Sequence, residues 1–186
     1  SLLFSLIVIL AACETHVQET AYIISISDGM SQKPLDGRLF LLISSNDSAE
    51  RGFQVSDDPG TQLVYGMDVE GVATGVPVEF DNGSFGYPLE NLNDLPEGEY
   101  YVQGLLHIYE TFNLSTGHTV KLPMDNGEGQ KWNRSPGNLL SKPQKVSISK
   151  GSTIEIELSD IIPPIDPPQD TKYIKHIRIQ SKMLTE

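Results

Sequence analysis

One stretch, residues 95–109, constrains the fold more than any other part of this chain. A Leu95-Pro96-Glu97-Gly98 turn precedes a run in which large apolar side chains fall on one parity, at Tyr100, Val102, Leu106 and Ile108. The other parity is mixed, with Tyr101, Gln103, Leu105, His107 and Tyr109. Because successive side chains of a strand point to opposite faces, the pattern predicts a long β-strand with one dry face. Ordering its backbone costs about 1–2 kcal/mol per residue, so the strand needs a second layer that buries this face.

Other short apolar runs predict further strands between the glycines and prolines. We expect them at residues 21–27, 38–45, 62–69, 78–80, 119–122, 145–149 and 153–158, with at most a short strand at 53–55. Residues 38–45 are apolar on both parities, which predicts a central strand covered on both faces. Residues 119–122 are expected to pair with the strand at 100–109. The last two runs are expected to form a hairpin around Lys150-Gly151, with Val146, Ile148, Ile154, Ile156 and Leu158 pointing inward.

These strands predict an all-β fold, an immunoglobulin-like β-sandwich of seven to nine strands over residues 21–160. Helical periodicity is weak throughout. The chain of 186 residues, 38% of them hydrophobic, is long enough for one domain plus a piece of another. Its net charge of −12 excludes a basic nucleic-acid-binding face and argues against tight electrostatic binding to anionic lipid.

The N-terminal segment predicts a membrane anchor that does not span the bilayer. An apolar run too short to span ends in Leu10-Ala11-Ala12-Cys13, which resembles the lipobox of bacterial lipoproteins. The resemblance implies that residues 1–12 are a signal peptide, truncated before Ser1, that Cys13 is lipidated and that residues 13–20 form a stalk. Two or more acyl chains anchor stably. The alternatives are an ordinary secretory signal peptide or a buried strand. We expect a bacterial envelope protein, in the outer membrane and facing the periplasm or the cell surface, with no disulfide in this segment.

A proline-rich linker is predicted at residues 161–171. The run Ile162-Pro163-Pro164-Ile165-Asp166-Pro167-Pro168 favours extended polyproline geometry. A new apolar stretch begins at Lys172, so residues 172–186 are expected to start a following domain. The alternative is that Tyr173 to Gln180 folds back as an edge strand of the same domain.

The loop at residues 123–138 carries the candidate binding residues. It holds the only Trp of the chain, and Trp132 could stack on a sugar or peptide while Asn133 and Arg134 bond its polar groups. The face of Tyr101, His107 and Tyr109 would take part. The alternative is that Trp132 plugs the open end of the sandwich or docks the next domain. Asp125 and Glu128 could bind calcium with the Asn126 carbonyl, but the spacing lacks the oxygen alternation of a calcium loop.

Neither a catalytic set nor a cofactor is predicted in this segment. His16, His107, His118 and His176 are scattered, and no pair has metal-ligand spacing. The nearest run to a Gly-x-Ser-x-Gly nucleophile elbow is Asn82-Gly83-Ser84-Phe85-Gly86, which is misplaced by one residue and is expected to be a turn.

The Leu95-to-Gln103 run also resembles the last-hairpin motif of immunoglobulin-like and transthyretin-like bacterial domains. Together with the lipobox, the loop at 127–138 and the tail at 170–181, the chain resembles the front of bacterial lipoproteins in which such a module precedes an esterase domain of the α/β-hydrolase type. The resemblance implies an accessory domain that scaffolds or orients a hydrolase lying after Glu186. The rival prediction is a carbohydrate- or peptide-binding module that uses the Trp132 loop.

Overall fold

The computed structural model describes residues 19–46, 55, 61–81, 83–125, 128–177 and 179. The predicted lipobox and Cys13, most of the stalk, most of the short strand at 53–55 and the end of the chain after 179 lie outside these residues.

The described chain is nearly all β, which confirms the predicted class. Its ten strands are β1 (Ala21–Ile26), β2 (Leu35–Ser44), β3 (Leu63–Val72), β4 (Val78–Glu79), β5 (Gly86–Tyr87), β6 (Gly98–Asn113), β7 (Thr119–Pro123), β8 (Leu139–Ser141), β9 (Gln144–Ile148) and β10 (Thr153–Ile161). A short 3-10 helix, η2 (Leu92–Asp94), lies before β6, and the Asn91 side chain caps it by accepting from the Asn93 amide.

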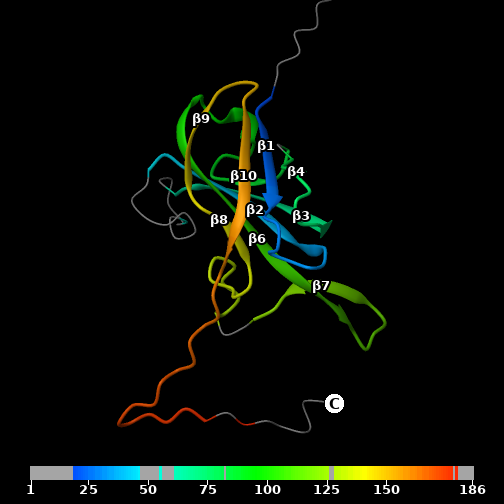
Figure 1. The fold of residues 1–186 in the computed structure, drawn as a ribbon, viewed down its shortest axis with the longest axis vertical. Helices are drawn as coiled ribbons and strands as arrows, with labels where there is room; N and C mark the ends of the chain where they lie inside the picture. Colours follow the sequence, from blue (N-terminus) through cyan, green and yellow to red (C-terminus); the bar gives the residue numbers. More distant parts are fainter. Residues whose placement is uncertain are drawn as a thin grey trace, which may run out of the picture.

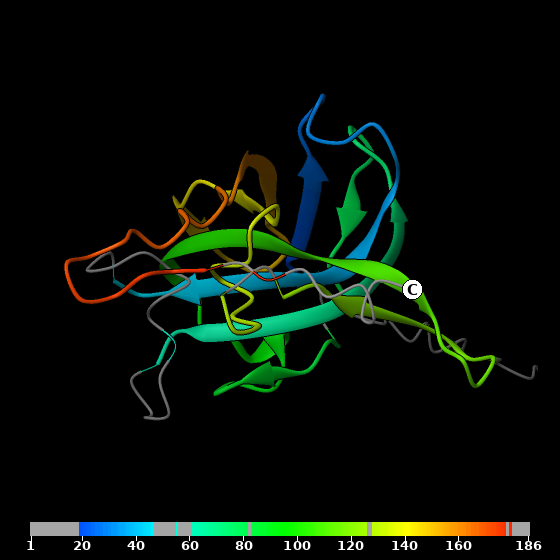
Figure 2. The same cartoon turned by 90° about the horizontal axis from the view of Figure 1, so that it is seen from below.

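Hydrogen bonding joins the described strands into one curled sheet in the order β4-β1-β10-β8-β6-β2-β3-β5, with β7 and β9 also paired to β6 (Figure 1). β6 is the organising strand, as its sequence predicts, because it pairs with β2, β7, β8 and β9. In Figure 2 the dark-blue strand β1 stands at a steep angle to the long strands β6, β2 and β3. The sheet therefore curls over its own inner face and encloses a core.

The core lies between the dry face of β6 and the strands β1 and β10. Val102 and Leu106 on β6 are buried, and an added Cβ on Gly104 would lie 3.0 Å from side-chain atoms of both Ile156 and Leu158. β2 is covered on both faces at its C-terminal half, as predicted, because Leu41, Leu42 and Ile43 are all fully buried. The glycine in the middle of β6 thus lets the two layers approach closely.

The predicted hairpin between residues 145–149 and 153–158 is wrong. The turn at Ser149–Ser152 joins two strands that do not pair with each other: β9 is antiparallel to β6, whereas β10 is parallel to β1 and antiparallel to β8. The inward positions are nonetheless correct, because Ile148, Ile154, Ile156 and Leu158 are buried. A two-residue alternation determines which side chains face the core. The same alternation is expected whether the two strands pair with each other as a hairpin or pair with different strands on opposite sides of the core.

The parallel pairing of β1 and β10 fixes how the chain passes through the domain. Tyr22 lies opposite Ile154 and Ile26 lies opposite Leu158, so both strands run in the same direction. The chain enters β1 at one end of the domain, the stalk end, and leaves β10 at the opposite end, the linker end (Figure 1).

Gly104→Val should lower the free energy of unfolding by about 1–3 kcal/mol, because its side chain would overpack the contact with Ile156 and Leu158. Urea denaturation measures the change. Thr111→Val, on the exposed end of the same strand, is the control and should change stability by no more than about 0.5 kcal/mol. Equal stability of the two variants would contradict the described packing.

Stability should fall as the pH rises above about 10, the pKa of an unfolded tyrosine. Burial, with a smaller effect of Tyr100, raises the pKa of Tyr22 to about 12, and burial also raises the pKa of Tyr65. Because the folded state holds both phenols neutral, their contribution is fully present below the unfolded pKa and is lost as the pH rises through the folded one. Urea unfolding between pH 8 and pH 11 tests this. The double variant Tyr22→Phe/Tyr65→Phe should show a shallower decline, and an unchanged slope would refute the assignment.

Candidate functional site

The loop around Trp132 closes over the mixed face of β6. The side chains of Gln103, Leu105 and His107 on this face are buried. The ring of Trp132 stacks on Phe40 of β2, with the ring centroids 4.8 Å apart and the planes 25° from parallel. The described residues 128–138, here called the Trp132 loop, therefore use their aromatic side chain to cover the sheet.

Hydrogen bonds from Asn138 and Gly137 hold the Trp132 loop to both β6 and the linker. The Ile108 amide donates to Asn138 Oδ1 at 3.0 Å, and Asn138 Nδ2 donates to the Trp132 carbonyl at 2.8 Å. The Ile162 amide donates to the Asn138 carbonyl, and the Gly137 amide donates to the Ile162 carbonyl, each at 2.9 Å. The loop thus fixes Ile162, the residue after β10, against β6.

His107 is a buried titratable group beneath this region. Its side chain is 6% exposed, its ring lies edge-on to Tyr109 at 5.5 Å, and Nε2 has no hydrogen-bond partner in the described part of the chain. Burial lowers the pKa of His107, and the nearby Glu128 carboxylate offsets only part of this effect. The imidazole is therefore neutral at pH 7.

The candidate sugar-binding residues do not line one pocket. Asn133 and Arg134 line a hollow of about 480 Å³ with Leu140 and the end of β10, whereas Trp132 is not among its lining residues. A sugar would have to stack on the ring face of Trp132, and this half-buried ring already stacks on Phe40. The aromatic and the polar groups therefore have separate surroundings.

The candidate calcium residues also have different surroundings. Asp125 is exposed and accepts a hydrogen bond from the Gly129 amide at 3.3 Å, while Glu128 is buried. Asn126, the third proposed ligand, lies outside the described residues. Among the residues that the structure describes, no three His, Cys, Asp or Glu side chains gather to hold a metal ion.

The remaining candidates for chemistry stay apart in the described structure. His118 is exposed at the β6–β7 turn, and His176 lies 3.7 Å from Asp170 in the linker region. The described part of the run at 82–86 forms a turn into the edge strand β5, closed by a hydrogen bond from the Ser84 amide to the Asp81 carbonyl. This geometry is not the strand-to-helix junction that a nucleophile elbow requires.

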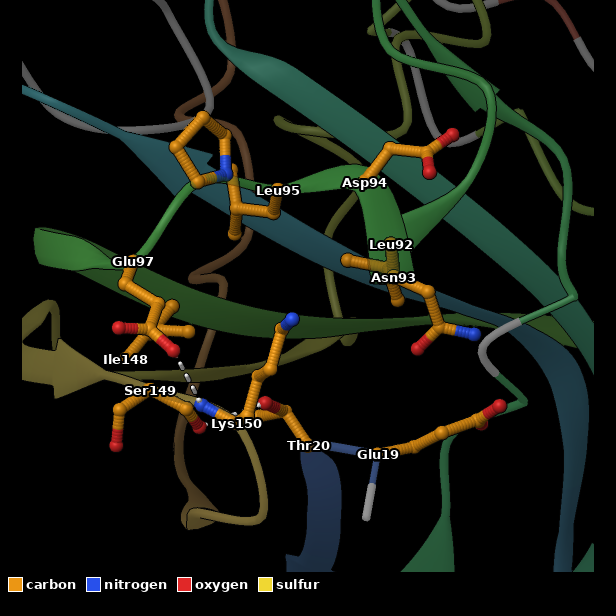
Figure 3. Close-up of a pocket in the computed structure, with 11 residues that line it drawn as sticks. Glu19, Thr20, Leu92, Asn93, Asp94, Leu95, Glu97, Ile148, Ser149 and Lys150 are labelled. Atoms are coloured by element: carbon orange, nitrogen blue, oxygen red, sulfur yellow. Dashed lines mark hydrogen bonds between the residues drawn. The ribbon is translucent and has the colours of Figure 1, made fainter. Parts of the chain in front are cut away.

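A hollow of about 550 Å³ lies at the end of the domain where residues 19 and 20 lead into β1 (Figure 3). Its wall combines η2, the turn before β6 and the β9–β10 turn. The Lys150 amide donates to Glu97 Oε1 at 3.3 Å, and Thr20 Oγ1 donates to the Ser149 carbonyl at 3.0 Å. The described lining residues include acids, a lysine and a serine but no histidine. One hydrogen bond ties Thr20, just before β1, to the β9–β10 turn, and the other ties that turn to the turn before β6. This hollow therefore lies where residues 19 and 20 enter the domain.

Several residues that shape the site were not singled out in the sequence. Phe40 stacks on the Trp132 ring, and Asn138 holds the loop to β6 by hydrogen bonds. Ser141 also binds β6: its hydroxyl accepts a hydrogen bond from the Gly104 amide, and its carbonyl accepts one from the Gln103 side chain. The sequence does contain a signal for Phe40: an apolar side chain on the outer face of a central strand predicts that another segment covers it. Nothing in the local pattern around Asn138 shows which strand its side chain reaches.

No family model, curated protein or solved structure matches this chain. Among the described residues, no helix has the length and apolar character needed to cross a membrane.

Acidification should destabilise the domain through His107. Because the folded pKa lies below the unfolded value of about 6.5, the contribution of the neutral imidazole is present above that pH and is lost as the pH falls through the folded pKa. His107→Leu should therefore flatten the decline in unfolding free energy between pH 7 and pH 5. Trp132 fluorescence reports the unfolding, and His118→Leu, an exposed histidine, is the control. Parallel pH profiles for the wild type and His107→Leu would contradict this account.

Proposed function

We propose that residues 21–160 are a non-catalytic accessory domain of a lipid-anchored bacterial envelope protein, which holds and orients a hydrolase domain located after residue 186. The observation that carries the proposal is the parallel pair of β1 and β10, which puts the incoming and outgoing chain at opposite ends of the domain. A domain threaded in this way keeps the stalk apart from the linker and from any unit that the linker carries.

The size of the domain suits this role. β10 has nine residues, so the domain spans about 30 Å between its ends at roughly 3.3 Å per residue. Residues 163–170 are exposed and lie in no helix or strand, and the chain runs away from the domain there (Figure 1). A lipid on Cys13 would tether the stalk end, and the hydrolase domain would lie on the side away from the membrane.

A structural role for the Trp132 loop also supports the proposal. The ring of Trp132 stacks on Phe40, and the hydrogen bonds of Asn138 and Gly137 fix Ile162, here called the root of the linker. Fixing the linker root orients whatever the linker carries. His107, which could transfer protons, is buried beneath the loop, and His118 and His176 lie elsewhere in the described chain.

Hydrolysis by the full-length protein should not depend on the polar residues of this domain. The variants Asp125→Asn, Glu128→Gln and Arg134→Ala should keep kcat and KM for p-nitrophenyl esters within about twofold of the wild type, a difference of under about 0.5 kcal/mol, because the reacting groups would lie in the hydrolase domain. A serine-to-alanine change in a Gly-x-Ser-x-Gly motif after residue 186 is the positive control and should abolish turnover.

Two outcomes would contradict the proposal. The first is a loss of about a hundredfold or more in kcat for any of the three domain variants, which would place reacting groups here. The second is glycan binding by the intact protein that disappears in Trp132→Ala but survives in Tyr87→Ala, a control at an exposed aromatic residue on β5. That result would establish the rival carbohydrate-binding role.

A further inference from the structure

Exposed apolar side chains gather at the linker end of the domain. Before the linker, the described chain has eight large hydrophobic residues that are exposed, and four of them are on or beside the β6–β7 hairpin or at the end of β10. Leu122 is 51% exposed, Ile161 50%, Leu114 46% and Met124 37%. The other four, Val55, Val76, Phe85 and Tyr87, belong to other segments. Of the first four, Leu122, Met124 and Ile161 lie near the point where the chain leaves the domain, whereas Leu114 is at the tip of the β6–β7 hairpin.

These side chains are continuous with the root of the linker. Leu122 on β7 lies directly opposite Glu110 on β6. Glu110 and Met124 share a hollow of about 170 Å³ with residues 135–138 of the Trp132 loop. Residues 137 and 138 of that loop hold Ile162 by two backbone hydrogen bonds. We call Glu110, Leu122, Met124, Pro136 and Ile161 the linker-end patch.

The hairpin that carries much of this patch is fixed to the sheet by its opposite face. Lys121, whose side chain points away from that of Leu122, contacts Asp36 of β2 at 2.9 Å and Glu70 of β3 at 3.1 Å. The hydrogen bonds that Lys121 donates to both carboxylates raise its pKa, so it remains charged. With Lys121 held in this way, Leu122 keeps its outward orientation.

The chain beyond the linker offers a surface of complementary chemistry. Tyr173 is 85% exposed, Ile177 80% and Ile179 81%. Residues 172–179 contain two lysines and an arginine and no Asp or Glu, so this segment is basic as well as apolar. The patch is apolar and carries the carboxylate of Glu110, with Asp160 in the hollow beside Ile161. Residues 163–171 reach about 28 Å at roughly 3.1 Å per residue, which is enough to fold back onto the patch.

We propose that the linker-end patch is the docking surface for the folded unit that begins with residues 172–179 of the same chain. The inference rests on the proposed function, because that function supplies the unit. Docking holds the unit in one orientation against the domain, so the linker does not let the unit move independently of the domain. The apolar contact supplies affinity, and Glu110 facing the lysines supplies register.

Hydrogen exchange on the full-length protein tests the proposal. Amides of residues 119–122 and of Met124 should exchange at least about tenfold more slowly in the wild type than in the full-length double variant Leu122→Asp/Ile161→Asp. Both side chains are half exposed, so the variant should fold. Val76→Asp, at a position 53% exposed near β4, is the matched control and should leave exchange in residues 119–124 unchanged. Cleaving an engineered protease site in the linker of the intact protein should leave the two parts associated in the wild type but not in the double variant.

The docking inference and the proposed function fail in different ways. If a unit is present after residue 186 and exchange in residues 119–124 is the same in the wild type and the double variant, the docking inference is overturned while the proposed function stands. If no folded unit is present there, both fall. If the protection depends on protein concentration and light scattering gives the mass of a dimer, a second copy covers the patch, and the inference is likewise overturned.

Discussion

The close approach of β6 to β1 and β10 at Gly104 is the contact on which the rest of the structure depends. A glycine in the middle of a long strand leaves room for Ile156 and Leu158, and together with Ile24 these side chains seal the inner face of the curled sheet. Apolar burial is the main stabilising term for this domain, because Cys13 is the only cysteine of the chain and no disulfide can form within it. Loss of that approach would separate the two layers and expose most of the core.

The same contact determines the path of the chain. β10 can reach the core opposite Gly104 only by crossing from β9, which pairs with β6, through the turn at Ser149–Ser152. It then lies parallel to β1 and ends beside the Trp132 loop. The stalk end and the linker end are opposite because of this crossing. The proposed roles, separation from the membrane and orientation of a further unit, follow from this packing.

Much of the fold could be predicted from the sequence because alternation reports burial directly. The dry face of β6, the two-sided cover of β2 and the inward positions of β9 and β10 all come from that pattern. Strand pairing does not, since the alternation at residues 145–158 fits a hairpin and an arch equally well. For the site, the sequence singled out Trp132 but could not reveal that Phe40, far away along the chain, lies beneath its ring. Contacts between distant segments depend on the whole fold, which local spacing does not encode.

Nuclear Overhauser contacts across β10 in the folded protein test the central claim most directly. The account predicts parallel cross-strand contacts between β1 and β10, in the register that places Tyr22 opposite Ile154 and Ile26 opposite Leu158. Antiparallel contacts between β9 and β10, with Ile148 opposite Thr153, would contradict it. The two strands would then form a local hairpin, and the chain would not pass through the domain from one end to the other.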